Sequence, residues 1–214
     1  MSALIDDFDK SLKYYKKRPP FKSPNFYYDA VSRAKVDGMW LEFGVWVGTS
    51  SRIISSFMPD KNKVLYGFDS FEGLPEDWAC SETGVVQKEG KKGAFNLNGE
   101  IPKPPAKNIK YIKGWFEDTL PDFVKEHKEP LAFLHVDSDL YSSAKTIFNH
   151  LSDRIVKGTV IIFDEFYNYV GYKDHEYKAF QELLQEKDIS YKWIGHVVDG
   201  RQASLIITEV KDNA

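Results

Sequence analysis

Cysteine is nearly absent from this chain, because Cys80 is the single cysteine among 214 residues. One cysteine excludes an internal disulfide framework, the device that stabilises many small extracellular domains. Cys80 lies in a polar loop segment with no histidine beside it, and we interpret this thiol as incidental. The shortage of cysteine favours a reducing compartment, so we expect a cytoplasmic protein.

Long apolar runs and a large charge excess are missing as well. No stretch approaches the length of a membrane span, and the first residues, MSALIDDFDK, are too acidic and polar for a signal peptide. The formal net charge is −3, and basic clusters such as Lys91-Lys92 are short. We therefore expect neither a nucleic acid nor a membrane as a partner, while homo-oligomerisation stays open.

Internal repeats and low-complexity segments are not visible either, and the length suits one α/β domain with a sizeable core. Apolar residues at helical spacing predict a helix from Ile5 to Tyr15, and a second helix follows Pro24. We expect residues 1–36 to be an N-terminal helical segment that covers the substrate side of a domain spanning 37–214.

Strand and helix patterns alternate after that segment. Asp118 or Thr119 is predicted to cap the helix after the third strand. The chain then ends in two strand patterns joined by Asp199-Gly200-Arg201, a strong hairpin signal. These patterns predict an α/β fold with a doubly wound, mostly parallel seven-stranded sheet and a C-terminal antiparallel hairpin. The strands are expected at 39–44, 63–69 and 108–114, within 131–143 and 158–166, and at 191–198 and 202–210; the helices at about 49–57, 144–151 and 176–186.

Two of the apolar strands end in paired carboxylates. Asp137 and Asp139 follow the strand in LAFLHVDSDLYSS, and Asp164 and Glu165 follow the strand in GTVIIFDEF. Ligands of open α/β sheets bind at the carboxyl ends of the strands, where these four acids would repel one another without a cation, a proton or a cationic ligand. Single acids after strands are often only caps or turn residues, but two pairs favour a charged functional site.

A second site signal lies at the end of the first strand. In LEFGVWVGTSSRI, Gly44 permits a tight turn, Gly48 permits close approach, and Thr49 and Ser50 open a helix suited to a carboxylate or phosphate. Asp69 closes the next strand 25 positions after Gly44, where an acid typically accepts hydrogen bonds from ribose hydroxyls. The pattern predicts a nucleoside-containing ligand without separating NAD from S-adenosylmethionine.

Several strings in order over residues 41–166 carry a family resemblance: LEFGVWVGTSS, YGFDSFEGLPEDW, KGAF, KGWFEDTLP, HVDSDLYSS and VIIFDEF. Together they resemble the macrocin O-methyltransferase family of class I S-adenosylmethionine-dependent enzymes, which methylate sugar hydroxyls of natural products. The resemblance implies a Rossmann-like methyltransferase fold, S-adenosylmethionine as cofactor, Mg²⁺, and a small-molecule acceptor, expected to be a sugar.

The same resemblance assigns roles to residues. Glu42 and Gly44 would face the amino-acid end of the cofactor, with Gly48, Thr49 and Ser50 nearby; Asp69 would bind the ribose with Ser70 beside it, and Trp115 and Phe116 would lie around the adenine. Asp137, Asp164 and Glu165 would hold the metal, Asp137 also bordering the cofactor, and Asp139 would be the general base. Asp164-Glu165-Phe166 departs from the Asp-Asp-Tyr that is usual in the family.

Some further residues have two interpretations. Phe166, Tyr167, Tyr169 and Tyr172 are expected to be ordinary packing, although they suit a sugar-stacking wall, and His175 is a second candidate base. We interpret His135 as a hydrogen-bonded core residue. Arg201 at the hairpin turn is either a substrate contact or a solvated turn residue, and we favour the second interpretation.

Three other functions compete with the metal-assisted enzyme. One is a metal-independent methyltransferase in which Asp139 or His175 acts alone. Another is a cofactor-binding protein without catalysis. The last is a nicotinamide dehydrogenase, which the terminal hairpin and Trp46 disfavour.

Overall fold

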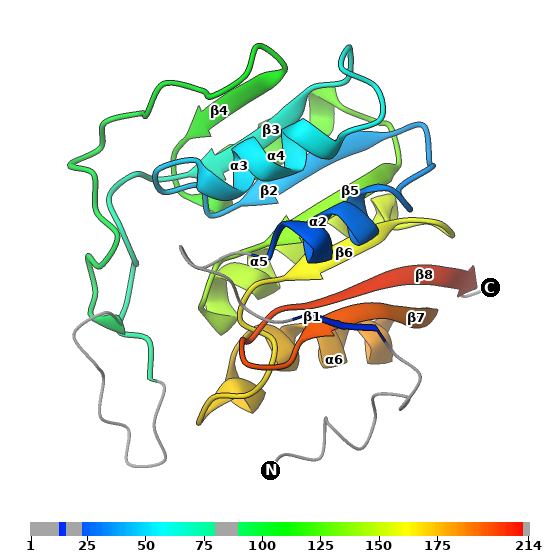
Figure 1. The fold of residues 1–214 in the computed structure, drawn as a ribbon. Helices are drawn as coiled ribbons and strands as arrows, with labels where there is room; N and C mark the ends of the chain where they lie inside the picture. The colour runs from blue at the N-terminus through cyan, green and yellow to red at the C-terminus, as the bar shows by residue number, and fades with distance from the viewer. Residues whose placement is uncertain (1–12, 16–22, 80–89, 212–214) are drawn as a thin grey trace.

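One eight-stranded sheet organises the molecule, in the order β1-β7-β8-β6-β5-β2-β3-β4 (Figure 1). It is seen in a computed structural model that describes residues 13–15, 23–79 and 90–211. The strands are β1 (Lys13–Tyr15), β2 (Met39–Phe43), β3 (Leu65–Asp69), β4 (Ile109–Lys113), β5 (Leu131–Val136), β6 (Val160–Phe163), β7 (Asp188–Val197) and β8 (Ala203–Lys211). The helices are α2 (Pro24–Val31), α3 (Thr49–Phe57), α4 (Phe116–Glu126), α5 (Tyr141–Leu151) and α6 (Glu176–Glu186), with short 3₁₀ turns η2 (Ser152–Arg154) and η3 (Tyr172–Asp174).

The predicted hairpin is confirmed and supplies the antiparallel strand. β8 pairs antiparallel with both β6 and β7, and the other strand pairs are parallel. The last strand in the sequence therefore lies inside the sheet, between β6 and β7. Seven of the strands are the predicted ones, and the short β1 adds the eighth at the edge.

Two local predictions are wrong. Lys13–Tyr15, placed in a helix by their spacing, form β1 and pair in parallel with Gly195–Val197 of β7, because an open sheet edge overrides a weak helical pattern. The remainder of that predicted helix lies outside the described residues. The cap of α4 is Trp115, whose backbone is extended, so Asp118 is a first-turn residue.

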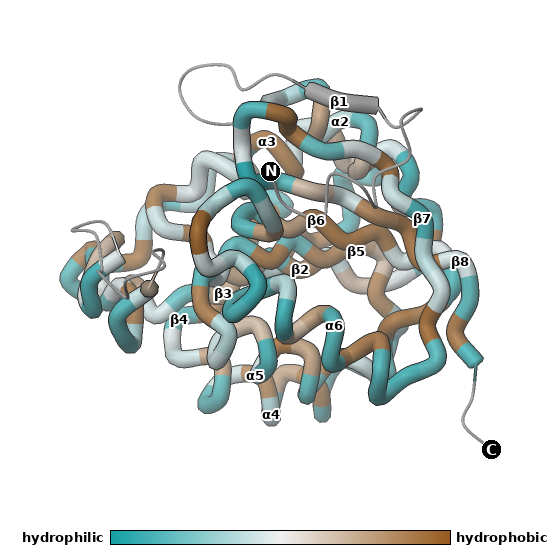
Figure 2. Tube along the Cα trace, turned by 90° about the horizontal axis from the view of Figure 1, so that it is seen from below, coloured by the Kyte–Doolittle hydropathy of each residue, from teal (hydrophilic) through white to brown (hydrophobic). Residues whose placement is uncertain are grey.

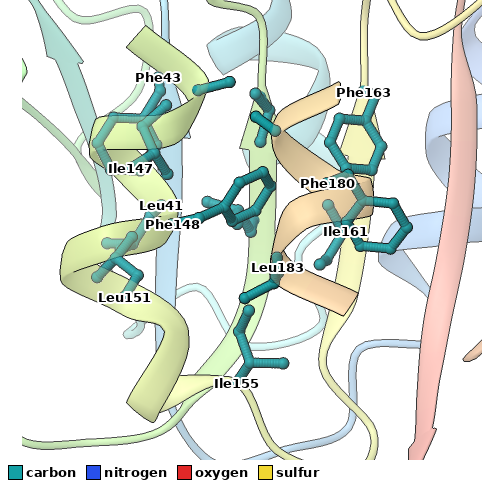
Figure 3. Packing of buried hydrophobic residues seen from close by; sticks show 14 of the residues in the cluster. Leu41, Phe43, Ile147, Phe148, Leu151, Ile155, Ile161, Phe163, Phe180 and Leu183 are labelled. Carbon is teal, nitrogen blue, oxygen red and sulfur yellow. The ribbon is translucent and has the colours of Figure 1, made fainter. Parts of the chain in front are cut away.

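Helices cover both faces of the sheet (Figure 2). The helices α4, α5 and α6 lie against one face, where Leu41, Phe43, Phe148 and Phe180 belong to one apolar cluster (Figure 3). The helices α2 and α3 lie on the other face with a second cluster. All residues of β5 and β6 are buried, as expected for strands covered on both sides. No helix in the described part of the chain is long and apolar enough to cross a membrane.

The parallel arrangement brings the carboxyl ends of β2, β3, β5 and β6 to one edge of the sheet. The described parts of the connection between β3 and β4, residues 70–79 and 90–108, run along that same side of the molecule (Figure 1). These parts are held to each other through hydrogen bonds from Leu97 and Gly99 to the carbonyl of Phe71. Both predicted site signals therefore come to the same edge.

Candidate active site

A cavity of about 550 Å³ opens at this edge and joins the two predicted sites. Its lining contains residues from the glycine-containing turn after β2, from the ends of β3, β5 and β6, and from the start of α4. The predicted residues that line it are Gly44, Thr49, Ser50, Asp69, Ser70, Trp115, Phe116, Asp137, Asp139, Asp164 and Glu165. Glu42, Gly48 and His175 are not among the lining residues.

Asp69 ties two loops together at one end of the cavity. One carboxylate oxygen accepts the backbone N–H groups of Val45 and Trp46, each at 2.8 Å, and the other accepts that of Phe71 at 2.7 Å. A carboxylate offers about four acceptor positions, so it retains capacity for a ligand hydroxyl. Asp69 therefore shapes the loops as well as lining the cavity.

Gly44 sits where the two predicted sites meet. Its φ is +89°, and a Cβ there would collide with the backbone carbonyl oxygen of Asp137. The close approach follows from the neighbouring strands, since the N–H of Asp137 donates to the carbonyl of Phe43 at 2.8 Å. Only glycine fits this junction between β2 and β5. Gly48, with φ +77°, is the N-cap of α3.

Glu42 is fully buried beneath the cavity and belongs to a hydrogen-bonded chain. The Ser51 hydroxyl donates to its Oε2, and its Oε1 lies 3.1 Å from His135 Nδ1. This geometry supports a positioning role for Glu42 beneath the turn, rather than direct exposure to a ligand. His135 is a hydrogen-bonded core residue, as predicted.

The chain continues towards the acidic cluster. His135 Nε2 lies 3.3 Å from the Tyr27 hydroxyl, which donates to Asp164 Oδ1 at 3.2 Å. The amide of Gln202, in the hairpin, donates to Asp164 Oδ2 at 3.2 Å. A buried polar path thus runs from the turn after β2 to the acid after β6, and Asp164 already accepts two hydrogen bonds from protein donors.

The carboxylates after β5 and β6 form a concentrated negative cluster. Ligand atoms of Asp137, Asp139 and Glu165 all lie within 4.8 Å of one another, and those of His135, Asp137 and Asp164 form a second such group. Asp137 belongs to both groups, so the predicted trio of Asp137, Asp164 and Glu165 spans the two.

Glu165 carries the clearest sign of an incomplete environment. Burial, followed by the charges of Asp164, Asp139 and Asp137, raises the pKa of its carboxyl well above the ordinary value. Its Oε2 is buried and has no hydrogen-bond partner in the described part of the chain. A set of carboxylate oxygens with an unpartnered buried member suits a hard divalent cation such as Mg²⁺.

Glu176 is a site residue that the sequence reasoning missed. It is fully buried at the start of α6, and its Oε1 accepts the backbone N–H groups of Ser138 and Asp139 at 3.0 and 3.2 Å. Its Oε2 accepts the N–H of Glu165 at 3.3 Å. Burial raises its pKa well above the ordinary value. One side chain therefore clamps both acidic loops, and only its place in the first turn of a helix behind them hints at this.

Three of the aromatic residues after β6 pack in the core, as predicted. Phe166, Tyr167 and Tyr172 are buried in the apolar cluster, so ordinary packing is the correct interpretation for them. His175 caps α6, and its Nε2 lies 2.9 Å from the carbonyl oxygen of Ala79. The position of His175 outside the cavity lining argues against a role as base.

Arg201 differs from the prediction. The sequence reasoning placed it in solvent at the hairpin turn, whereas it is half-buried and lines the cavity. Its guanidinium lies over the rings of Tyr169, at 4.7 Å from the centroid, and Trp78, at 5.4 Å. The hairpin packs against the loop after β6, which turns the arginine inwards.

The strand order, the antiparallel β8 and the cavity at the carboxyl ends of the strands define a class I methyltransferase fold. The chain belongs to the macrocin O-methyltransferase (TylF) family, whose model matches residues 25–192.

One curated relative and two solved structures are similar to this chain, and the structures show the likeness of the fold. An 8-demethyl-8-(2,3-dimethoxy-alpha-L-rhamnosyl)-tetracenomycin-C 4'-O-methyltransferase from Streptomyces olivaceus is 30% identical over 145 residues, which are 61% of this chain and 54% of that protein. The solved O-methyltransferase NovP is 22% identical, with a TM-score of 0.65 over 87% of this chain and 79% of NovP. TomG from Streptomyces achromogenes, solved with SAM, is 13% identical, with a TM-score of 0.53 over 87% of this chain and 81% of TomG. The chain spans 54 to 62% of the curated relatives that it matches.

Proposed function

We propose that this protein is an S-adenosylmethionine-dependent O-methyltransferase that methylates a hydroxyl group of a sugar or sugar-containing small molecule. The observation that carries the proposal is the shared cavity, in which Asp69 and the carboxylates of Asp137, Asp139 and Glu165 line one space. Family membership supports the reaction class, and the tetracenomycin relative supports the acceptor class, because its name describes methylation of a rhamnosyl compound.

The half around Asp69 would hold the cofactor. S-adenosylmethionine supplies an electrophilic methyl group on a sulfonium. Asp69 would accept hydrogen bonds from the ribose, beside Ser70, and Gly44 would let the cofactor approach the backbone of β2. Thr49 and Ser50 lie at the start of α3, where backbone N–H groups suit the carboxylate of an amino acid. Trp115 and Phe116 would border the adenine.

The acidic half would hold Mg²⁺ through Asp137, Asp164 and Glu165. A bound divalent cation lowers the pKa of a coordinated hydroxyl group, which a neutral sugar hydroxyl needs before it can act as a nucleophile. Glu165 has a buried Oε2 without a hydrogen-bond partner among the described residues, which supports its role as a ligand. Asp164 accepts hydrogen bonds from Tyr27 and Gln202 and keeps acceptor positions for a cation.

Asp139 is the proposed general base. It lines the cavity, its backbone has φ +60°, and its N–H is held by Glu176, so its position is fixed by the fold. A carboxylate there would take the proton of the acceptor hydroxyl as that oxygen attacks the methyl group. The remaining contribution of the protein would be alignment of the two reactants in one cavity.

Two measurements test the proposal separately. Calorimetric titration with S-adenosylhomocysteine should show binding in the micromolar range or tighter, and a screen of glycosylated acceptors with S-adenosylmethionine should show release of S-adenosylhomocysteine. Absence of cofactor binding by the folded protein would exclude the methyltransferase, and binding without turnover of any acceptor would favour the non-catalytic alternative.

Chelation decides between the metal-assisted and the metal-independent enzyme. We expect turnover of a verified acceptor to stop in EDTA and to return on addition of Mg²⁺. In the metal-independent alternative, Asp139 acts alone. Full turnover in EDTA, together with no calorimetric Mg²⁺ binding, would establish that alternative.

A further inference from the structure

We propose that Arg201 and Trp78 form an anion-recognition site in the wall of the cavity, and that the acceptor carries a phosphate or carboxylate group bound there. This inference rests on the proposed methyltransferase function and deepens it by naming the charge of the acceptor.

The electrostatic setting of Arg201 is unusual within the cavity. Among the described residues, Arg201 supplies the one basic side chain of the lining, which otherwise carries the carboxylates of Asp69, Glu117, Asp137, Asp139, Asp164 and Glu165. Despite these neighbours, the guanidinium has no ion pair within 4.0 Å in the described part of the chain. A permanent cation with unused donors therefore borders the space in which the acceptor would bind.

The fold holds this arginine in place. Its carbonyl oxygen accepts the N–H groups of Phe166 at 3.0 Å and Tyr167 at 3.3 Å, and the amide of Asn168 donates to the carbonyl of the adjacent Gly200 at 2.9 Å. Contact with the faces of Tyr169 and Trp78 restrains the guanidinium itself. A planar guanidinium that is already ordered loses little entropy when it binds a phosphate or carboxylate in two-point fashion.

Trp78 supplies an independent observation at the same place. Its side chain is 6% exposed and lines the cavity, yet its Nε1 is buried without a hydrogen-bond partner among the residues that the structure describes. A buried N–H group without an acceptor is unfavourable, so such groups are rare in native proteins. An anionic oxygen of a ligand next to Arg201 would provide the missing acceptor.

The charge distribution would also orient the acceptor. An anionic group is repelled by the cluster of Asp137, Asp139 and Glu165 and attracted by Arg201, so it would bind at the hairpin wall. The neutral hydroxyl to be methylated would then be the part of the acceptor that faces Asp139. Two kinds of acceptor share this chemistry: a sugar linked to a nucleoside diphosphate and a sugar acid.

The test uses three probes on the whole protein in the presence of S-adenosylhomocysteine: UDP-glucose, D-glucuronate and methyl α-D-glucoside. We expect UDP-glucose or D-glucuronate to bind about tenfold or more tightly than the neutral glucoside, with an affinity that falls as salt rises. Whichever anionic probe binds better identifies the phosphate or the carboxylate as the recognised group.

Variants of Arg201 and Trp78 test whether these residues cause the preference for anionic probes. R201Q should remove the preference for the anionic probes, about tenfold or more, and leave the glucoside unchanged, whereas R154Q, a matched change in η2 away from the cavity, should bind all three probes as the parent does. W78F keeps an aromatic ring but removes the indole N–H, so it should weaken binding of the anionic probes by a smaller factor. If R201Q does not fold, W78F alone tests the anion site.

Equal binding of charged and neutral probes, or no binding of the anionic ones, would overturn the inference. An undiminished preference in folded R201Q and W78F would overturn it as well. These results leave the proposed function standing if S-adenosylhomocysteine still binds and a neutral glycoside is methylated. Loss of cofactor binding in the parent protein would instead reject the proposed function itself.

Discussion

The two halves of the cavity are built in different ways. The half around Asp69, called the local half, is held by the turns that directly follow two neighbouring strands, since its carboxylate accepts the N–H groups of Val45 and Trp46 after β2 and of Phe71 after β3. The acidic half depends on residues far away in the sequence: Tyr27, Glu176 and Gln202 hold the acids after β5 and β6. A local half can be recognised as a motif, whereas a half assembled from distant segments needs the fold to be known.

The largest expected effect is on catalysis in the acidic half. Asp139→Asn should lower kcat on a verified acceptor by about 10²–10⁴-fold, because it removes the proton acceptor. Asparagine tolerates the φ of +60° at this position, so the loop should keep its shape. Calorimetry should show unchanged S-adenosylhomocysteine affinity.

Asp174→Asn is the matched control for that change, because Asp174 is exposed in η3 and does not line the cavity. It should leave kcat unchanged. An Asp139→Asn protein with parental kcat would remove Asp139 from the mechanism.

The next effect concerns the clamp that unites the acidic loops. Glu176→Ala leaves the N–H groups of Ser138, Asp139 and Glu165 without their acceptor, so the free energy of unfolding should fall by on the order of 3 kcal/mol. Glu176→Gln keeps one acceptor oxygen and should lose only about 1 kcal/mol. Chemical denaturation measures both, and equal stability of the two variants would contradict the clamp.

A substitution of Asp69 in the local half should weaken cofactor binding. Asp69→Ala should weaken S-adenosylhomocysteine by about 1.5–3 kcal/mol, since hydrogen bonds to a charged group are lost. Asp69→Asn keeps one acceptor oxygen for some of the backbone N–H groups. Its affinity for S-adenosylhomocysteine should therefore lie between those of the parent protein and Asp69→Ala. Calorimetric Mg²⁺ affinity should be the same in all three proteins. Parental cofactor affinity in Asp69→Ala would show that the nucleoside lies elsewhere.

The smallest expected effect concerns the buried hydrogen-bonded path that connects the two halves. Tyr27→Phe removes the hydroxyl between His135 and Asp164 and should cost about 1 kcal/mol of unfolding free energy. Tyr28→Phe is the control, because Tyr28 is 53% exposed on the same helix. A Tyr27→Phe protein as stable as Tyr28→Phe would mean that the buried path contributes nothing to stability.

The comparison also explains what could be predicted from the sequence. Continuous patterns were sufficient for the strands from β2 onwards, for the terminal hairpin, and for the gathering of Asp69, Asp137, Asp139 and Glu165 at one edge. Hydrophobic periodicity identifies the strands. The direction of parallel strands then places the residues at their carboxyl ends on one edge.

The features that were predicted wrongly or missed depend on contacts between distant segments. β1 exists because β7 offers an edge, Arg201 faces the cavity because Phe166 and Tyr167 bind its carbonyl, and Glu176 acts through contacts with Ser138 and Asp139. Each depends on a contact between segments that no local pattern records, so propensity and spacing could not have found it.

The position of β8 has a consequence for the order of folding. The strands β6 and β7 are not neighbours in the sheet, and β8, which comes after both in the chain, joins them. During synthesis, the sheet from β4 to β6 can form while β7 has no partner on its inner side. Completion therefore waits for Ala203–Lys211, and the same late event delivers Arg201 and Gln202 to the cavity. The pocket is closed on its hairpin side only when the last strand is inserted, so an incomplete chain would not present a finished binding surface.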